Sequence, residues 1–189
     1  MDELLKIRKL YKLKNVKRTA PVGDRKESPA EHSWSCLILA DYFMGRISEK
    51  VDRLKVYELL MYHDVSEIYA GDTSPEEKST RTNKSKEEMD AAIRLSKELP
   101  SNTGKKFISL FKEFEEDKTP EARFAKAVDR MDAFIHFLDY KKAWAGWDEK
   151  RLREFYKECF DSFPEVSALF EQLIQYAKKN GYGKDNKKI

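Results

Sequence analysis

The chain has 189 residues, of which 40% are hydrophobic and 38% charged, a balance typical of one folded domain with a heavily charged surface. The formal net charge is +3. From Lys178 to the C-terminus, however, five lysines face one aspartate, which exceeds that total and leaves the preceding residues slightly acidic. The folded body therefore lacks the positive excess of a typical nucleic-acid-binding protein, and we expect no nucleic-acid partner.

The glycine, proline and cysteine contents narrow the fold class and the cellular setting of the protein. Seven glycines and six prolines are too few for a loop-rich sandwich or barrel. Cys36 and Cys159 are far apart in the sequence, so we expect buried, unpaired thiols without a metal-like neighbourhood. No apolar run approaches the roughly 18 residues of a membrane span, and the N-terminus lacks a signal-peptide core. We therefore expect a cytoplasmic protein without a membrane partner.

Apolar residues at helical spacing predict the main elements. Helices are expected over residues 2–14, 28–45, 48–69, 85–99, 101–116 and 119–140, with two more beginning at Asp148 and Ser162. The polar stretches 15–27 and 76–84 predict an irregular loop and a mobile loop. Gly71 is expected to end the third helix. The aromatic residues at helical spacing, Trp34 among them, are expected to form the core.

Two of these helices begin with a recognisable capping pattern. Ser28 and Glu31 form a capping box around Pro29, and Ser162 and Glu165 have the same spacing. Alternation typical of strands, internal repeats and linkers between domains are absent from the sequence. We therefore predict an all-α fold, a single bundle of about seven or eight helices over residues 1–180, with a basic, mobile tail over 181–189.

Four residues in three predicted helices carry the strongest functional signal: His32, the pair His63-Asp64, and Asp129. Apolar neighbours should point each of them into the core. Two imidazoles and two carboxylates suit a borderline-to-hard divalent cation with open positions for water or phosphate. Taken singly, each histidine is more often structural, and Asp129 could pair with Arg130 or face solvent. Taken jointly, the four favour a metal site.

Two further carboxylates lie near the histidine-aspartate pair. Glu67 is four residues after His63, on the same face of the predicted helix, and Asp72 follows the expected end of that helix. A carboxylate beside a bound cation can act as a general base or orient the attacking water. We therefore expect Glu67 and Asp72 to be catalytic, although both could be solvated residues at a helix end.

The remaining candidates are a histidine and the cations of the first loop. Arg18, Arg25 and Lys26 precede the helix of His32, and a guanidinium there could bind phosphate through two hydrogen bonds. Most loop cations are simply solvated. His136 lies on a similar face to Asp129 but about 10 Å farther along the helix, too far for the same ion. We expect His136 to belong to the core or to support the ligands.

Longer strings of residues resemble the HD-domain phosphohydrolases, in the 5′-deoxynucleotidase-like branch that hydrolyses nucleoside monophosphates. The resemblance covers roughly residues 15–140 and rests on strings in this order: Arg25–Trp34, His63–Thr73, Glu113–Phe124 and Ala127–Arg130. It implies an all-helical fold, a single divalent ion (Mn, Co, Mg, Ni, Fe or Zn) and a homodimer.

The resemblance also implies a role for each candidate residue. The metal ligands would be His32, His63, Asp64 and Asp129. Glu67 would serve the attacking water, Asp72 would lie near the sugar, and Arg18 would bind the phosphate. Relatives often carry a tryptophan after this arginine, whereas Thr19 stands here. The sequence therefore puts base stacking at this position in doubt, and with it any base or sugar preference.

Three hypotheses follow. The first is hydrolysis of the phosphomonoester of (deoxy)nucleoside 5′-monophosphates by a metal-activated water. The second keeps the metal site but cleaves another bond, as in HD phosphodiesterases or nucleoside triphosphohydrolases, of which the short chain disfavours the latter. The third is a non-catalytic helical interaction module in which the four residues are structural. We favour the first.

Overall fold

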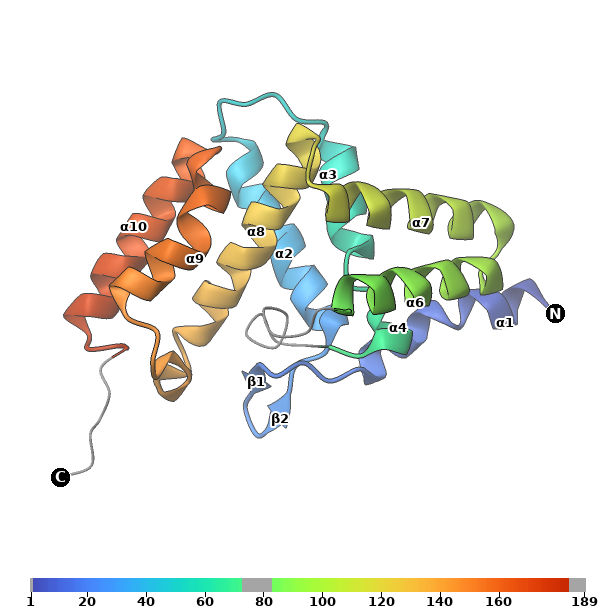
Figure 1. Cartoon of the computed structure of the whole chain (residues 1–189), viewed down its shortest axis with the longest axis horizontal. Coiled ribbons are helices and arrows are strands. Elements are labelled where there is room, and N and C mark those ends of the chain that lie inside the picture. Colours follow the sequence, from blue (N-terminus) through green and yellow to red (C-terminus); the bar gives the residue numbers. More distant parts are fainter. Residues whose placement is uncertain (1, 73–82, 184–189) are drawn as a thin grey trace.

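The computed structural model describes residues 2–72 and 83–183 (Figure 1). Its elements in chain order are α1 (Glu3–Ile7), the 3₁₀ helix η1 (Leu10–Asn15), β1 (Pro21–Val22), β2 (Arg25–Lys26), α2 (Pro29–Met44), α3 (Arg53–Tyr62), α4 (Glu67–Ala70), α6 (Lys84–Glu98), α7 (Ser101–Glu116), α8 (Pro120–Phe137), the 3₁₀ helix η2 (Lys141–Trp144), α9 (Glu149–Asp161) and α10 (Pro164–Lys179). The predicted all-α fold is confirmed.

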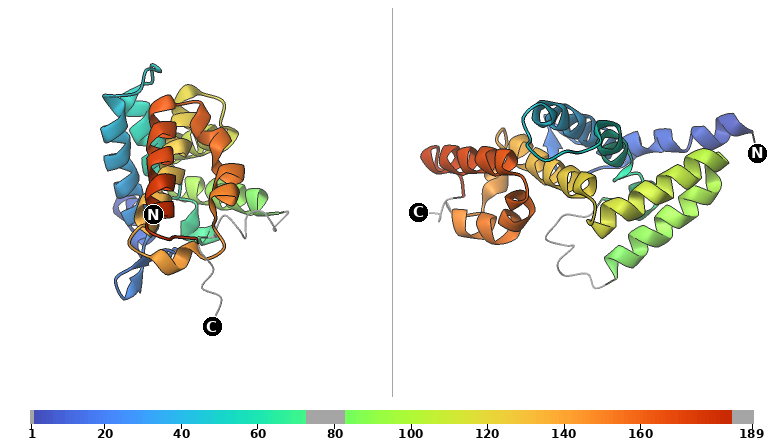
Figure 2. Two further views of the ribbon diagram at one scale, coloured as in Figure 1. Left: turned by 90° about the vertical axis from the view of Figure 1, so that its left-hand side faces the viewer. Right: turned by 90° about the horizontal axis from the view of Figure 1, so that it is seen from above.

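Helix α8 crosses the middle of the molecule and packs against α2, α3, α7, α9 and α10 (Figure 1). Seen from above, the α6–α7 pair and the α9–α10 pair lie at opposite ends (Figure 2). The larger buried apolar cluster joins α2, α3 and α8 to the C-terminal pair, and the smaller joins α6 and α7 to η1. Helices α2, α3 and α8 therefore form the centre of the molecule, between the α6–α7 pair and the α9–α10 pair.

The two helices that carry His32 and Asp129 have well-formed N-termini. At α2, the side chain of Ser28 accepts from the backbone N–H of Glu31, whose carboxylate in turn accepts from the N–H of Ser28. The predicted capping box is thus present. At α8, the side chain of Thr119 accepts from the backbone N–H of Ala122. Such caps satisfy donors that a helix start would otherwise leave unpaired.

The continuous helix predicted over 48–69 is wrong. Helix α3 ends at Tyr62, and the chain turns before α4 begins at Glu67. The N–H groups of Val65 and Glu67 bond to carbonyls three residues back rather than four, which is the hydrogen-bond pattern of a 3₁₀ turn and not of an α-helix. Gly71, at φ 73°, ends α4 as predicted. His63 and Asp64 therefore lie in a break between two helices.

Two predictions for the N-terminal region are also wrong. The helix predicted over 2–14 is split into α1 and η1. The apolar side chains of α1, at Leu4, Leu5 and Ile7, are exposed, whereas Leu13 of η1 is buried. Packing against the core therefore stabilises η1 but not α1. The loop predicted over 15–27 contains the short hairpin β1–β2.

Side-chain burial corrects two further predictions. The capping box at Ser162 does not form, because α10 begins after the buried Phe163 and the carboxylate of Glu165 accepts from the backbone N–H and hydroxyl of Ser48. Trp34, expected in the core, is 65% exposed on α2. The phenylalanines expected there are buried.

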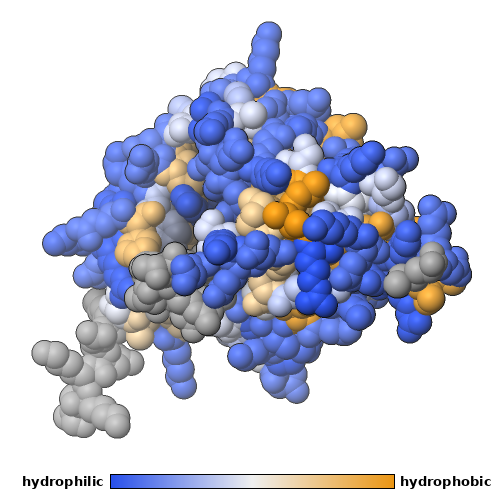
Figure 3. Space-filling view, turned by 45° about the vertical axis from the view of Figure 1, so that its right-hand side comes forward, coloured by the Kyte–Doolittle hydropathy of each residue, from blue (hydrophilic) through white to orange (hydrophobic). Residues whose placement is uncertain are grey.

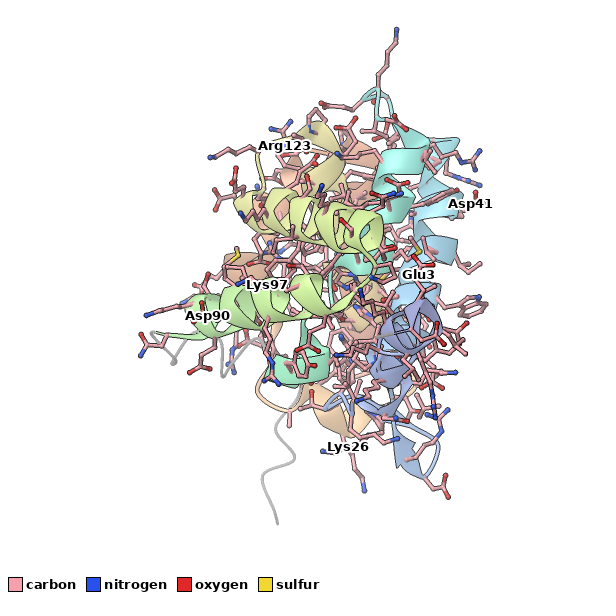
Figure 4. All side chains as sticks on the ribbon, turned by 90° about the vertical axis from the view of Figure 1, so that its right-hand side faces the viewer. Glu3, Lys26, Asp41, Asp90, Lys97 and Arg123 are labelled. Atoms are coloured by element: carbon pink, nitrogen blue, oxygen red, sulfur yellow. The ribbon has the colours of Figure 1, made fainter. Side chains whose placement is uncertain are left out.

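The face of the molecule seen in Figure 3 is largely hydrophilic, with a few apolar patches. Asp41 of α2 and Asp90 and Lys97 of α6 are examples of the charged side chains that project from it (Figure 4). Within the described ranges, no helix combines the length and apolar character needed to span a bilayer. Most of the loop predicted over 76–84, and most of the tail predicted over 181–189, lie outside the described residues, so the domain limits stay predictions.

Candidate active site

The structure brings the four predicted ligands to one point between α2, the α3–α4 break and α8. Asp129 Oδ1 lies 2.8 Å from His32 Nε2 and 3.8 Å from His63 Nε2. Asp64 Oδ2 lies 3.3 Å from His63 Nε2 and 4.0 Å from His32 Nε2. Both imidazoles are buried, and the two carboxylates are partly exposed toward a cavity. The break between α3 and α4 lets His63 and Asp64 reach the same point.

The hydrogen bond of His63 fixes which ring nitrogen faces this point. Its Nδ1 lies 2.7 Å from the backbone carbonyl oxygen of Leu60, which can only accept, so Nδ1 carries the proton. Nε2 therefore faces the point where the carboxylates converge. This buried atom makes no hydrogen bond, although carboxylate oxygens of Asp64 and Asp129 lie close by. Two buried carboxylates around one ring nitrogen need positive charge at this point, which a bound cation or a second proton on the ring supplies.

His32 is oriented by a carboxylate that the sequence interpretation missed. Its Nδ1 lies 2.8 Å from Oδ2 of Asp132, which is itself buried on α8. Burial opposes the charged form of His32, yet Cys36 and the hydrogen bonds with Asp129 and Asp132 raise its pKa above the ordinary value. A carboxylate behind a ligating histidine orients the ring and increases its basicity. The position of Asp132, three residues after Asp129 on the same helix, was the available signal.

The donor set fits a divalent cation. Atoms bonded to one six-coordinate ion at about 2.1 Å lie about 3 Å apart when adjacent and about 4 Å apart when opposite. The separations from 2.8 to 4.0 Å match that range. Burial opposes ionisation of Asp64, but His63 and Arg18 hold its pKa well below the usual range. Burial opposes ionisation of Asp129 too, but its hydrogen bond with His32 holds its pKa below the usual range, so both aspartates are charged and able to bind a metal.

Cys36 corrects another prediction, because its thiol does lie beside the presumed ligands. Its sulfur, the side chains of His32 and His63 and the carboxylate of Asp129 offer donor atoms within 4.8 Å of one another. The sulfur is 3.7 Å from His32 Nδ1 and 3.6 Å from Nε2. Because it is nearly equidistant from both nitrogens, it lies off the axis of the Nε2 lone pair. Burial raises the pKa of the thiol to about 12.

Arg18 reaches the site from the first loop and is held by two carboxylates. Its guanidinium lies 3.0 Å from Asp64 Oδ2 and 3.1 Å from Glu27 Oε2. Burial opposes its charge, but the surrounding carboxylates, Asp64 first, raise its pKa. Glu27, which the sequence interpretation missed, also exchanges backbone hydrogen bonds with this loop and lies 3.5 Å from His136 Nδ1. His136 therefore supports Arg18 indirectly, through Glu27.

The other loop cations do not belong to the site. Arg25 makes an ion pair with Glu31, and both Arg25 and Lys26 are exposed on the hairpin. Asp72 is closer, since its carboxylate accepts from the backbone N–H of Thr19 at 3.0 Å and so ties the end of α4 to the loop of Arg18.

Glu67 lies in the first turn of α4 and is 5% exposed. The prediction that it shares a helix face with His63 is wrong, because the break at 63–66 separates them. It nevertheless lines the same cavity as Asp64, Asp72 and Asp129. Its position thus depends on the turn between α3 and α4.

A cavity of about 240 Å³ opens beside these residues. Its lining residues on α8 run from Asp129 to Phe137, about 12 Å along the helix, and we distinguish two ends on that basis. Arg18 and the four carboxylates of Asp64, Glu67, Asp72 and Asp129 line one end. The other is formed by aromatic and aliphatic side chains of α8, η2, the turn after it, and α9: Phe134, Phe137, Trp144, Trp147, Leu152 and Tyr156. A charged end beside an apolar end suits a ligand with a charged head and an apolar body.

Comparison with known proteins agrees with the geometry. Residues 10–167, which contain all four converging side chains, match the HD domain family model. The 5′-deoxynucleotidase HDDC2 of Dictyostelium discoideum is 28% identical over 173 residues, covering 86% of this chain and 91% of that protein. The Xenopus laevis HDDC2 is 29% identical over 182 residues, covering 89% and 87%. A crystal structure described as a predicted metal-dependent phosphohydrolase from Magnetospirillum magnetotacticum MS-1 has a TM-score of 0.84 and 28% identity, covering 95% and 93%. The chain belongs to the HD-domain family.

Proposed function

We propose that this HD-domain phosphohydrolase removes the phosphate of deoxynucleoside 5′-monophosphates, using a divalent ion held by His32, His63, Asp64 and Asp129. The observation that carries the proposal is the convergence of donor atoms from all four residues, at which the buried Nε2 of His63 makes no hydrogen bond. This chain matches relatives named 5′-deoxynucleotidase over most of their length, and those relatives support the choice of substrate.

The ion would lower the pKa of water and neutralise charge on a phosphate oxygen. Asp64 is preferred to Cys36 as the fourth ligand, since the thiol lies off the lone-pair axis of His32 while Asp64 Oδ2 faces both ring nitrogens. Two imidazoles and two carboxylates leave open positions for water and substrate on a borderline-to-hard ion.

The residues around the cavity would share the remaining steps. Glu67 would accept a proton from the attacking water as the water oxygen bonds to phosphorus and the bond from phosphorus to the 5′ oxygen breaks, and a proton from solvent would complete the 5′-hydroxyl of the product. Arg18 donates hydrogen bonds to the phosphate, which competes with Asp64 and Glu27 for the guanidinium. Asp72, tied to Thr19 through one oxygen, leaves the other for the sugar. The products are inorganic phosphate and the deoxynucleoside.

We make two further proposals about the protein's setting, of which the resemblance to the 5′-deoxynucleotidase-like branch supports the first. The enzyme works as a homodimer, and it works in the cytoplasm on a small phosphorylated substrate. Sedimentation of the purified protein tests the first, and fractionation of cells tests the second.

Phosphate release from a panel of nucleotides tests the proposed reaction. Protein stripped by a chelator and reloaded in turn with Mn, Co, Mg, Ni, Fe or Zn would be offered deoxynucleoside mono-, di- and triphosphates and a cyclic dinucleotide. We expect turnover of the monophosphates and its loss in the stripped protein. Preference for triphosphates or for the cyclic dinucleotide would instead favour a triphosphohydrolase or a phosphodiesterase. Metal-free protein that cannot be reloaded would favour an interaction module.

A further inference from the structure

The aromatic end of the cavity carries a further inference, which rests on the proposed function. Its rings come from α8, η2 and α9, outside the part of the chain where the sequence suggested that substrate binds. The residues that line the cavity on α8 run from Asp129 to Phe137. Eight helical residues span about 12 Å, which is the length of an extended nucleoside monophosphate. A phosphate at the ligands would therefore leave its base among the rings.

Trp147 and Tyr156 are held in place by neighbours other than a ligand. The Trp147 ring has its centroid 5.9 Å from that of Tyr156, and the guanidinium of Arg151 covers it at 4.3 Å. Tyr156 packs edge-to-face on Phe134 at 4.6 Å. Arg151 also donates to the carbonyl of Gly146, which fixes the turn before Trp147. The two rings are thus positioned before any substrate arrives.

Trp144 forms the floor of this end. It is 3% exposed, and its indole N–H donates to the carbonyl of Phe137 at 2.8 Å. That hydrogen bond satisfies its only polar group, so it offers a base nothing but contact area. Small side chains of Ala133 and Ala143 line the same cavity and leave room between the rings.

We propose that Trp147 and Tyr156 form the nucleobase subsite, binding the base by stacking. Every base has an aromatic face, so stacking tolerates any of the four. Of the described residues that form the aromatic end, none is charged, and Arg130, which also lines the cavity, lies next to Asp129 in the sequence. The subsite therefore distinguishes nucleotides from sugar phosphates but discriminates weakly among bases.

The test compares substrates that differ only in the base. Wild type and Trp147→Ala would be assayed on the four deoxynucleoside 5′-monophosphates and on 2-deoxyribose 5-phosphate. We expect kcat/KM for all four nucleotides to fall about 5- to 100-fold in the variant, mostly through KM, with the sugar phosphate unchanged. Trp147→Phe should recover most of the loss because it keeps a ring. Tyr156→Phe should match wild type, whereas Tyr156→Ala should behave as Trp147→Ala does.

Two controls keep the outcome clear. Tyr176→Ala removes an exposed aromatic of α10 away from the cavity and should change nothing. Quenching of tryptophan fluorescence by deoxyadenosine, which has no phosphate, should be present in wild type and lost in Trp147→Ala. Equal kcat/KM for nucleotides and 2-deoxyribose 5-phosphate in wild type would overturn the subsite. Failure to hydrolyse any nucleotide would instead overturn the proposed function, and the quenching would still report on the subsite.

Discussion

The two ends of the cavity are built on different principles. At the charged end, each ring or guanidinium is held by a named polar partner: His63 by the carbonyl of Leu60, His32 by Asp132, and Arg18 by Asp64 and Glu27. At the aromatic end, Trp147 and Tyr156 are held by ring contacts. Removing one member of a buried polar network leaves its partner uncompensated, whereas removing one ring loses contact area.

This difference predicts two kinds of response to mutation. Loss of a proposed metal ligand at the charged end should abolish activity for every substrate, whereas changes at the aromatic end should act gradually and depend on the substrate.

The largest effect is expected from Asp129→Ala. Because Asp129 lies within 4 Å of both histidine donors, its loss leaves an incomplete ligand set. Metal content after purification should fall to background, and turnover should fall with it. Added Mn should raise the melting temperature of wild type but not of the variant, since only a bound ion stabilises the fold. Asp139→Ala, an exposed aspartate just past α8, serves as the control. Full metal retention in Asp129→Ala would remove that residue from the site.

Glu67→Gln should come next, with metal content unchanged and kcat lowered about 10²- to 10⁴-fold. Glu67 lines the same cavity as Asp64 and Asp129 and is not one of the four proposed ligands. The amide keeps the size of the side chain and removes only its ability to accept a proton. Metal analysis and steady-state kinetics on one preparation separate the two effects. An unchanged kcat would make Glu67 structural.

The sequence predicted the charged end far better than the aromatic end. His32 and Asp129 stand out because polar residues on apolar helix faces are costly without a partner. The break after Tyr62 could not be seen, because apolar periodicity continues through it. Nor could the aromatic end, since Trp147 and Tyr156 have the spacing of ordinary core residues. Their place in the cavity depends on how α9 packs against α8, which is a long-range contact.

Supporting carboxylates were equally hard to predict. Asp132 and Glu27 are buried, but a charged residue in a helix or a loop is usually solvated. Only the direction of each side chain distinguishes them from the exposed Asp139, and that direction follows from tertiary packing.

Asp132→Asn should weaken metal binding about 10- to 100-fold while leaving the ligands themselves in place. The amide can still contact His32 Nδ1, but it no longer carries the charge that raises the basicity of the ring. Titration of the stripped protein with Mn measures the affinity, and saturating Mn should restore most of the turnover. Affinity equal to wild type would show that the Asp132 charge is not needed.

Arg18→Ala should raise KM for nucleotides about tenfold and, unlike Trp147→Ala, should raise it equally for 2-deoxyribose 5-phosphate. Both substrates carry the phosphate, so the comparison separates the two ends of the cavity. Arg18→Lys should recover only part of the loss, because an ammonium lacks the planar fork. Arg25→Ala, in the same loop but paired with Glu31 outside the cavity, is the matched control. Unchanged KM in Arg18→Ala would leave Arg18 as a partner of Asp64 alone.

The smallest effect is expected from Cys36→Ala, which tests the boundary of the charged end. The thiol is fully buried against His32, yet its sulfur lies off the lone-pair axis, so its contribution should be packing rather than ligation. Metal affinity should stay within about twofold of wild type. The free energy of unfolding should fall by about 1 kcal/mol, as for the loss of one small buried group. Chemical denaturation and metal titration measure the two quantities separately. A large loss of zinc affinity with little loss of stability would instead make Cys36 a ligand, and the charged end would then be a site for a softer metal.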